Sequence, residues 1–313
     1  MRISPLLLSF STALLFTVLE AKAQQVPDIT FKPPIAMPAY AEGKGPVVLI
    51  DEGHFNFPPA SGQYGKYLAF ANLLFRDGYQ VQSLKAKFTK ESLKGGRILV
   101  IAYAGSQRNQ DDRSTSYAPA FTDEEVAAVR DWVKQGGSLF LIVDHLPMPA
   151  ANDKLAQVFG VEFHNGYAIE PGARGEEMIF KITDNSLRDH PITRGRNVEE
   201  IVYSVTTFTG SAFQLKAGGE PLLVLRKSVQ SFTPTAEEEI RPDTPKIPAG
   251  GWLQGATLRF GKGRLVVLGE AEMFSAQVSG LKKKPMGMNT PIASQNPQFL
   301  LNVAHWLSGL LGN

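Results

Sequence analysis

The fold is decided by the stretch Pro46-Val47-Val48-Leu49-Ile50-Asp51-Glu52-Gly53-His54. Its first five residues are apolar without interruption, and the run then stops abruptly at charged residues. A short apolar run that leads into a polar loop is typical of a parallel strand buried on both faces. The pattern returns at residues 98–102 and 139–143, and the second of these runs ends in Asp144-His145. We therefore predict three buried strands with polar side chains at their carboxyl ends.

Helices are predicted between these strands. Apolar residues recur at helical spacing over residues 67–75 until Asp77-Gly78 interrupts them, and residues 79–84 then alternate like a short strand. A second helix begins after Thr122, which forms a capping box with Glu125. Strands that alternate with helices predict the α/β class, with a mostly parallel sheet covered by helices on both faces.

The second half of the chain has a different pattern of apolar residues. Residues 160–250 hold short β-like runs, at 200–206 and 221–225, which predict a β-rich insertion. Residues 253–260 and 264–270 then predict a hairpin that joins the main sheet. A closing helix is expected with Asn296 as its cap, Pro297 at its first position, and a buried stripe of Phe299, Val303, Trp306 and Leu310.

The N-terminus has the pattern of a secretory signal. Arg2 precedes an apolar run over residues 6–19, and Ala21-Lys22-Ala23 supplies small residues for cleavage after Ala23. We expect residues 1–23 to be removed, residues 24–45 to form an extended lead-in that is not packed, and residues 46–313 to form a single domain. The mature protein is then exported to the periplasm or the extracellular space without a membrane span. A retained anchor is the alternative, because only Arg2 makes the start of the chain basic.

Composition excludes several classes of function. The chain has 32 Lys and Arg against 30 Asp and Glu, so nothing electrostatic points to nucleic acid or to anionic lipid. It has no cysteine, which rules out disulfides, a thiolate nucleophile and a cysteine-ligated metal.

The carboxyl ends of the strands form the candidate site, because ligands of open α/β sheets bind there. Carboxylates end three separate runs, and histidine accompanies them in two; such a cluster could bind a divalent metal or divide into a general acid and a general base. The candidates for catalysis are His54, Asp144, His145 and Glu270; the candidates for ligand binding are Asp51, Glu52, Asn56, Tyr103, Ser106, Glu272, Gln277 and Asn289; and a metal, if one is bound, would take Asp51, His54, Asp144 and His145.

Each candidate also has a purely structural interpretation. Asp51 or Asp144 could cap the helix or turn that follows it. Gln277 and Asn289 could satisfy buried backbone groups in an irregular loop.

The remaining motifs are weak. His190 precedes a proline and suits a turn, and His305 suits packing within the closing helix. Established metal-binding and phosphate-binding motifs are missing from the sequence, and Ser106 lacks the flanking glycines of a nucleophile elbow.

A resemblance to a known family rests on three segments. They are Asp51-Glu-Gly-His54-Phe-Asn56, the stretch from Phe121 through Trp132-Val-Lys-Gln-Gly-Gly-Ser-Leu to Asp144-His145, and Gly269-Glu270 together with Asn296-Pro-Gln-Phe-Leu-Leu-Asn-Val. These segments resemble exported members of the class I glutamine amidotransferase-like, flavodoxin-like superfamily, in a branch classed as a domain of unknown function. The resemblance implies a flavodoxin-like fold. Amidotransferases of the superfamily use a cysteine nucleophile, so the resemblance does not extend to glutaminase activity in a chain without cysteine.

Two functional hypotheses follow. The first is a non-catalytic exported domain that binds a small polar ligand, such as a carbohydrate, or an envelope protein at the strand ends. The second is an exported hydrolase, with or without a metal, that uses the Asp, His and Glu cluster. Whether these side chains converge in space discriminates between the two.

Overall fold

A computed structural model describes residues 25–55, 64–106, 117–172, 177–216, 218–235, 240–280 and 283–312. The expected signal peptide, residues 1–23, and the candidate ligand residue Asn56 lie outside these ranges.

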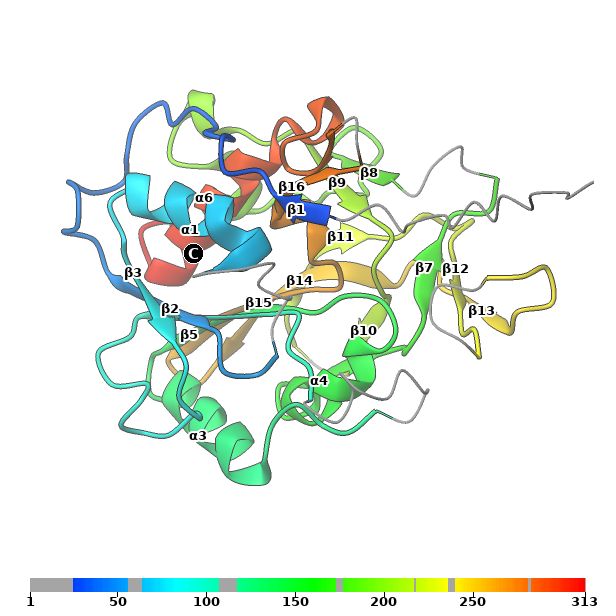
Figure 1. Ribbon diagram of the computed structural model, residues 1–313, viewed down its shortest axis with the longest axis horizontal. Coiled ribbons are helices and arrows are strands. Elements are labelled where there is room, and N and C mark those ends of the chain that lie inside the picture. The colour runs from blue at the N-terminus through cyan, green and yellow to red at the C-terminus, as the bar shows by residue number, and fades with distance from the viewer. Residues whose placement is uncertain are drawn as a thin grey trace, which may run out of the picture.

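The described residues form a large mixed sheet with the expected parallel half (Figure 1). Its strands lie in the order β3 (Gln80–Leu84), β2 (Val47–Asp51), β4 (Ile98–Ala102), β5 (Ser138–Ile142), β15 (Gly263–Leu268), β14 (Leu253–Phe260), β10 (Phe213–Leu215) and β6 (Val161–Phe163), and β11 (Glu220–Val224) also pairs with β14. The five strands from β3 to β15 are parallel, and β14, β10, β6 and β11 are antiparallel to their neighbours. Counted in chain order, the parallel strands follow the sequence 2-1-3-4-5, which is the flavodoxin-like order. The predicted fold class is confirmed.

Helices cover both faces of this sheet (Figure 1). On one face lie α1 (Leu68–Arg76) and α6 (Asn296–Ser308), and on the other lie α3 (Asp123–Lys134) and α4 (Met148–Gln157). Successive strand residues point to opposite faces. In β5, Phe140 and Ile142 therefore pack against the α1 and α6 side, whereas Leu139 and Leu141 pack against the α3 and α4 side. The uninterrupted apolar runs in the sequence are the result.

Three small antiparallel sheets extend the molecule beyond the carboxyl ends of the main strands. They are β1 (Gln25–Pro27) with β16 (Ala276–Ser279) and β17 (Lys284–Gly287); β7 (Tyr167–Ile169) with β12 (Gln230–Phe232) and β13 (Lys246–Pro248); and β8 (Glu177–Lys181) with β9 (Ser204–Phe208). Short helical turns complete the described structure: η1 (Gly65–Tyr67), α5 (Pro191–Arg194), η2 (Val198–Glu200), η3 (Glu272–Phe274) and η4 (Pro291–Ala293). Among the described residues, no helix is long and apolar enough to cross a membrane.

Three local expectations were wrong. Gln25–Pro27 of the lead-in is a paired strand, because its backbone completes the exposed edge of β16. Asn296 does not cap α6: its side chain bonds the backbone N–H and C=O of Thr206 and the C=O of Met273, so it joins the helix to β9 and η3. Leu310 follows the end of the helix and is 40% exposed. The capping box of Thr122 and Glu125 and the hairpin of β14 and β15 are confirmed.

Candidate functional site

The polar residues that follow β5 are Asp144, which is buried, and His145, which is partly buried. Asp144 is only 4% exposed, and its Oδ1 accepts the backbone N–H of His145 at 2.7 Å. Its Oδ2 accepts no hydrogen bond from the part of the chain that the structure describes. The His145 ring stacks on the ring of Tyr167, with 4.3 Å between centroids, and its Nδ1 lies 2.7 Å from the C=O of Leu146. Asp144 therefore acts in part as the turn cap that the structural interpretation expected, while one oxygen remains available.

Glu270 follows the neighbouring strand, β15, and is fully buried. Its two carboxyl oxygens accept the backbone N–H groups of Glu272 and Met273 at 2.7 and 2.9 Å, at the start of η3. The backbone of Gly210 packs directly against this side chain: a Cβ at position 210 would lie 2.7 Å from both Cβ and Cγ of Glu270. Gly210 also has a φ of +79°, which favours glycine. Backbone groups of Glu272, Met273 and Gly210 therefore hold the Glu270 side chain in place.

The electrostatics of this region are set by carboxyl groups on adjacent strands. Burial and the nearby charges of Asp144 and Glu272 raise the pKa of Glu270 well above its ordinary value. Burial also raises the pKa of Asp144, against the opposing charges of His145 and Lys66. For Lys66, burial lowers the pKa, although Glu272 and Asp144 favour its charged form. The carboxyl groups of Asp144, Glu270 and Glu272 therefore lie close enough at this end of the sheet to affect one another's ionisation.

A cleft of about 400 Å³ opens beside these residues. Its polar lining includes Gln25, Asp144, His145, Glu170, Glu177 and Glu272. Side chains of β7, β8, β9 and β17 supply apolar walls, among them those of Tyr167, Met178, Phe208 and Met286. The small sheets therefore form a wall of the cleft and contribute Glu170 and Glu177, while Asp144 and Glu272 follow β5 and β15. This is a concave, partly apolar site with a few polar groups, which is the usual form of a small-molecule site.

The candidates at the end of β2 form a separate group. The His54 ring lies between two carboxylates, with Nδ1 2.9 Å from Asp51 Oδ1 and Nε2 2.9 Å from Glu125 Oε1, and it packs against the rings of Phe88 and Phe121. Burial opposes protonation of His54, but the hydrogen bonds and charges of Asp51 and Glu125 outweigh it and raise its pKa. Burial likewise opposes ionisation of Glu125, yet hydrogen bonds from Thr122 and His54 lower its pKa. The geometry is that of a buried imidazolium held by two carboxylates.

The two groups are distinct because of the sheet order. β4 lies between β2 and β5, and neighbouring strands are about 4.8 Å apart, so the two strand ends are separated by roughly 10 Å. Within the described residues, no group of three or more histidine and acidic side chains is arranged to hold a metal ion. Asp51, His54, Asp144 and His145 are therefore not brought together as one metal centre, and both ring nitrogens of His54 already face carboxylates.

The other candidates have structural contacts of their own. Glu52 accepts hydrogen bonds from the backbone N–H of Tyr64 and the hydroxyl of Ser83. Gln277 donates to Ser275 Oγ at 2.7 Å, while Asn289 donates to the C=O of Gln277 at 2.9 Å and to Asp28 at 3.0 Å. Only the bond from Asn289 to the C=O of Gln277 matches the structural interpretation, since within the described part of the chain the Gln277 side chain bonds no backbone group and Gln277 Oε1 and Asn289 Oδ1 are buried without a partner. Tyr103, with a φ of +53°, and Ser106 lie where the chain leaves β4.

Sequence reasoning missed several residues of the cleft region. Lys66 donates from Nζ to the Gln25 side chain at 2.9 Å, and Tyr67 donates from its hydroxyl to the C=O of Ala271 at 2.6 Å. Tyr167 lies in a short strand of the insertion. None of these residues follows a strand of the main sheet, so the rule that locates sites at strand ends could not find them. The one sequence signal for these residues is that polar and aromatic side chains are frequent in the segments that contain them.

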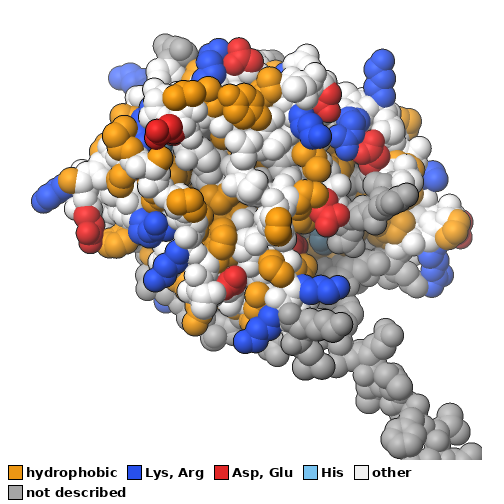
Figure 2. Space-filling model, turned by 90° about the horizontal axis from the view of Figure 1, so that it is seen from above, with side chains coloured by type: hydrophobic (Ala, Val, Ile, Leu, Met, Phe, Trp, Pro, Cys, Tyr) orange, Lys and Arg blue, Asp and Glu red, His pale blue; other side chains and the backbone are white. Residues whose placement is uncertain are grey.

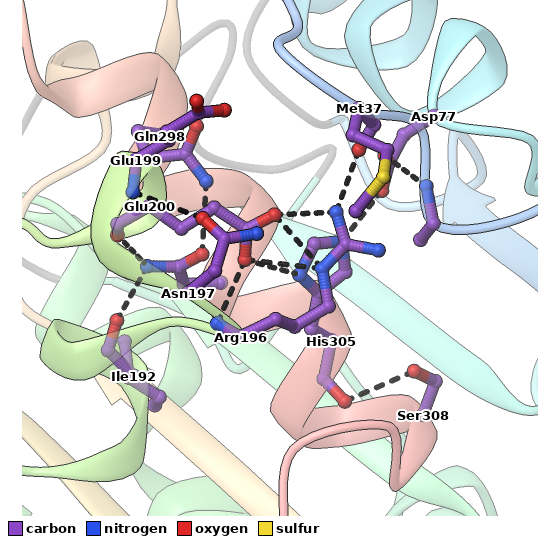
Figure 3. Close-up of polar contacts among 12 residues, drawn as sticks. Met37, Asp77, Ile192, Arg196, Asn197, Glu199, Glu200, Gln298, His305 and Ser308 are labelled. Atoms are coloured by element: carbon purple, nitrogen blue, oxygen red, sulfur yellow. Dashed lines mark hydrogen bonds and ion pairs between the residues drawn. The ribbon is translucent and has the colours of Figure 1, made fainter.

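A third polar cluster, around His305, serves the packing of the chain (Figure 3). His305 is fully buried, and its Nε2 lies 2.7 Å from Asp77 Oδ2 and its Nδ1 3.9 Å from Glu200. Arg196 pairs with Glu200 and donates to the C=O of Met37 at 2.6 Å. The cluster thus ties the lead-in and the turn at η2 to α6, which confirms the packing role expected for His305. The turn role of His190 is confirmed as well, since it caps α5.

On the face shown in Figure 2, lysine and arginine side chains are scattered among acidic and apolar ones and form no extended basic patch.

Comparisons with known proteins place the fold in a class. No protein-family profile matches the chain, and no curated protein matches it. Among solved structures, it is similar to the "mmIFT52 N-terminal domain", with a TM-score of 0.56 and 16% identity over 83% of this chain and 97% of that one. At this identity the similarity concerns the fold alone: an α/β domain with a mixed, mostly parallel sheet and small added antiparallel sheets.

Two further structures resemble the chain at lower TM-scores. One is a putative ThuA-like protein from Bacteroides uniformis, with a TM-score of 0.44 and 14% identity over 86% of this chain and 93% of that one. The other is the cytoplasmic protein STM1381 from Salmonella typhimurium, with a TM-score of 0.48 and 14% identity over 83% of this chain and 98% of that one.

Proposed function

We propose that this protein is an exported domain that binds a small polar ligand of the carbohydrate class in the cleft beside β5 and β15. The observation that carries the proposal is Asp144. It is 4% exposed and lines a cleft of about 400 Å³, and its Oδ2 accepts no hydrogen bond from the described residues. A ligand hydroxyl or amine that enters the cleft can donate a hydrogen bond to this carboxyl oxygen. The apolar walls suit the C–H faces of a sugar ring.

A ligand screen tests this function directly. The chain from Gln24 onward would be titrated calorimetrically with mono- and oligosaccharides, and the Asp144→Asn variant compared with Asp131→Asn. Asp131 is an exposed residue of α3 and provides a matched acidic control. We expect Asp144→Asn to weaken binding about tenfold or more and Asp131→Asn to leave it unchanged, since a hydrogen bond to a charged group contributes about 1.5 kcal/mol or more. Equal affinities in the two variants would remove Asp144 from the site.

Hydrolysis is a second candidate, favoured by one observation. Burial raises the pKa of Asp144, which would help this carboxyl to keep a proton and act as a general acid, and the half-buried Glu272 lines the same cleft. Turnover of nitrophenyl glycosides and esters by the wild type, with a rate lost in Asp144→Asn and retained in Asp131→Asn, would support a hydrolase. Binding without turnover would assign the cleft to the binding function.

A further inference from the structure

The fixed charges among the described lining residues of the cleft are all negative. Four carboxyl side chains, Asp144, Glu170, Glu177 and Glu272, are among its described lining residues, and no lysine or arginine is. A cleft lined by one sign of charge, with low-dielectric walls, concentrates ligands of the opposite sign.

The four carboxylates are not equivalent. Glu170 is already neutralised, because Arg226 Nε lies 3.1 and 3.0 Å from its two oxygens and Ser228 also donates to it. Glu177 is exposed at the first position of β8, where water screens its charge. Asp144 differs from both, since it is buried and presents an oxygen without a donor among the described residues. Of these three carboxyl groups, Asp144 is therefore the one that offers a buried oxygen atom to a ligand cation.

Two basic side chains act on Asp144: His145, whose Nε2 lies 3.9 Å from Asp144 Oδ1, and Lys66, whose charge opposes the rise in the pKa of Asp144. Lys66 Nζ donates to the side chain of Gln25, a lining residue, at 2.9 Å. A ligand cation that reaches Asp144 would thus enter a region where carboxyl groups outnumber the nearby lysine.

We propose that the ligand is cationic, an amine-bearing saccharide whose ammonium group binds Asp144 while its ring lies against the apolar wall that includes Tyr167, Met178 and Phe208. This proposal rests on the proposed function and specifies the ligand class. Asp144 Oδ2 accepts the ammonium N–H, and Glu272 adds negative charge in the same cleft. The volume of about 400 Å³ is at the small end of ligand sites and suits one or two sugar rings.

The experiment uses two probes that differ in charge at one position of each ring. A β-1,4-linked glucosamine disaccharide, protonated at about pH 6, and its N-acetylated counterpart would each be titrated into the chain from Gln24 onward at low and at high salt. We expect the amine form to bind about tenfold more tightly or better, and added salt to reduce this preference by screening the charges. In Asp144→Asn we expect the preference to fall to about threefold or less, with Asp131→Asn, on the exposed surface of α3, as the control that retains it.

The outcomes separate this inference from the function on which it rests. Equal affinity for both disaccharides, or tighter binding of neutral saccharides, overturns the cationic ligand and leaves a saccharide-binding cleft. Absence of binding for every saccharide, charged or neutral, overturns both. The wild type alone still tests the cationic ligand if Asp144→Asn does not fold. A preference for the amine disaccharide that added salt leaves unchanged is not due to charge.

Discussion

The polar group at the end of β2 and the polar group at the ends of β5 and β15 differ in role, and single residues explain the difference. At the end of β2, His54 joins Asp51 and Glu125 and is sealed by aromatic rings, so its role is to hold the loop after β2 against α3. At the ends of β5 and β15, Asp144 lines a cleft, and Glu270 is buried close enough for the charge of Asp144 to raise its pKa. Residues of the same types at equivalent strand ends therefore differ in role because their burial and partners differ.

Replacing His54 tests its structural role. His54→Asn removes the ring between two buried carboxylates, and we expect the free energy of unfolding to fall by about 3 kcal/mol, as for a broken buried ion pair. His164→Asn is the control, because His164 bonds a serine hydroxyl and not a carboxylate. Urea denaturation of both variants measures the difference. Equal losses would show that the two carboxylates gain nothing special from His54.

Glu270 makes stability depend on pH. Its pKa is raised in the folded protein by burial and by the charges of Asp144 and Glu272, so the folded state holds the proton more tightly than the unfolded chain does. Its contribution is complete below the unfolded pKa, about 4.3, and is lost as pH rises toward the folded value, with a slope of up to about 1.4 kcal/mol per pH unit. Urea denaturation across this pH range should show a shallower decline for Glu270→Gln than for the wild type. Parallel curves would contradict the shift.

Among the elements, the insertion matters most for the site. β7, β8 and β9 belong to small sheets outside the parallel half, yet they line the cleft. The N-terminal β1 pairs with β16, and its Gln25 lines the same cleft. The site is thus assembled where these added sheets meet the carboxyl ends of β5 and β15.

Asn296 tests how α6 is attached to these sheets. Its buried side chain makes three hydrogen bonds to the backbone of β9 and η3. Asn296→Ala leaves buried backbone groups unsatisfied, so we expect a loss of about 2–3 kcal/mol in the free energy of unfolding by urea. Gln298→Ala on the same helix removes only a bond to Asn302 within α6 and should cost less than about 1 kcal/mol. A small effect of Asn296→Ala would mean that water replaces these bonds.

At the scale of the whole molecule, the expected export of the protein can be tested at its N-terminus. We expect cleavage after Ala23, which leaves Gln24 as the first residue, directly before the strand that lines the cleft. Intact mass measurement of the protein from the periplasmic fraction of a bacterial host would show this N-terminus. Ala23→Phe should cause the precursor to accumulate, because the cleavage site needs small residues. A wild-type chain found uncleaved in membranes would instead support the retained anchor.

The parallel half of the sheet and the helices α1, α3 and α6 were predictable because their signals are local, whereas α4 was not predicted. The run Val47–Ile50, the capping box of Thr122 and Glu125, and the hairpin of β14 and β15 each depend on neighbouring residues. The role of Asn296 was not predictable in the same way. An asparagine before a proline suits a cap by its local pattern, and only the approach of β9 and η3 gives its side chain other partners.

The sequence by itself determined the class of fold and the strand ends at which polar residues gather, because burial on both faces leaves a continuous apolar signature. Only the tertiary structure decided which strand ends are neighbours. It placed β15 beside β5 and β4 between β5 and β2, so Asp144 and Glu270 lie together while Asp51 and His54 lie apart. Strand order depends on crossovers and on contacts between residues far apart in the chain, and no local pattern encodes it.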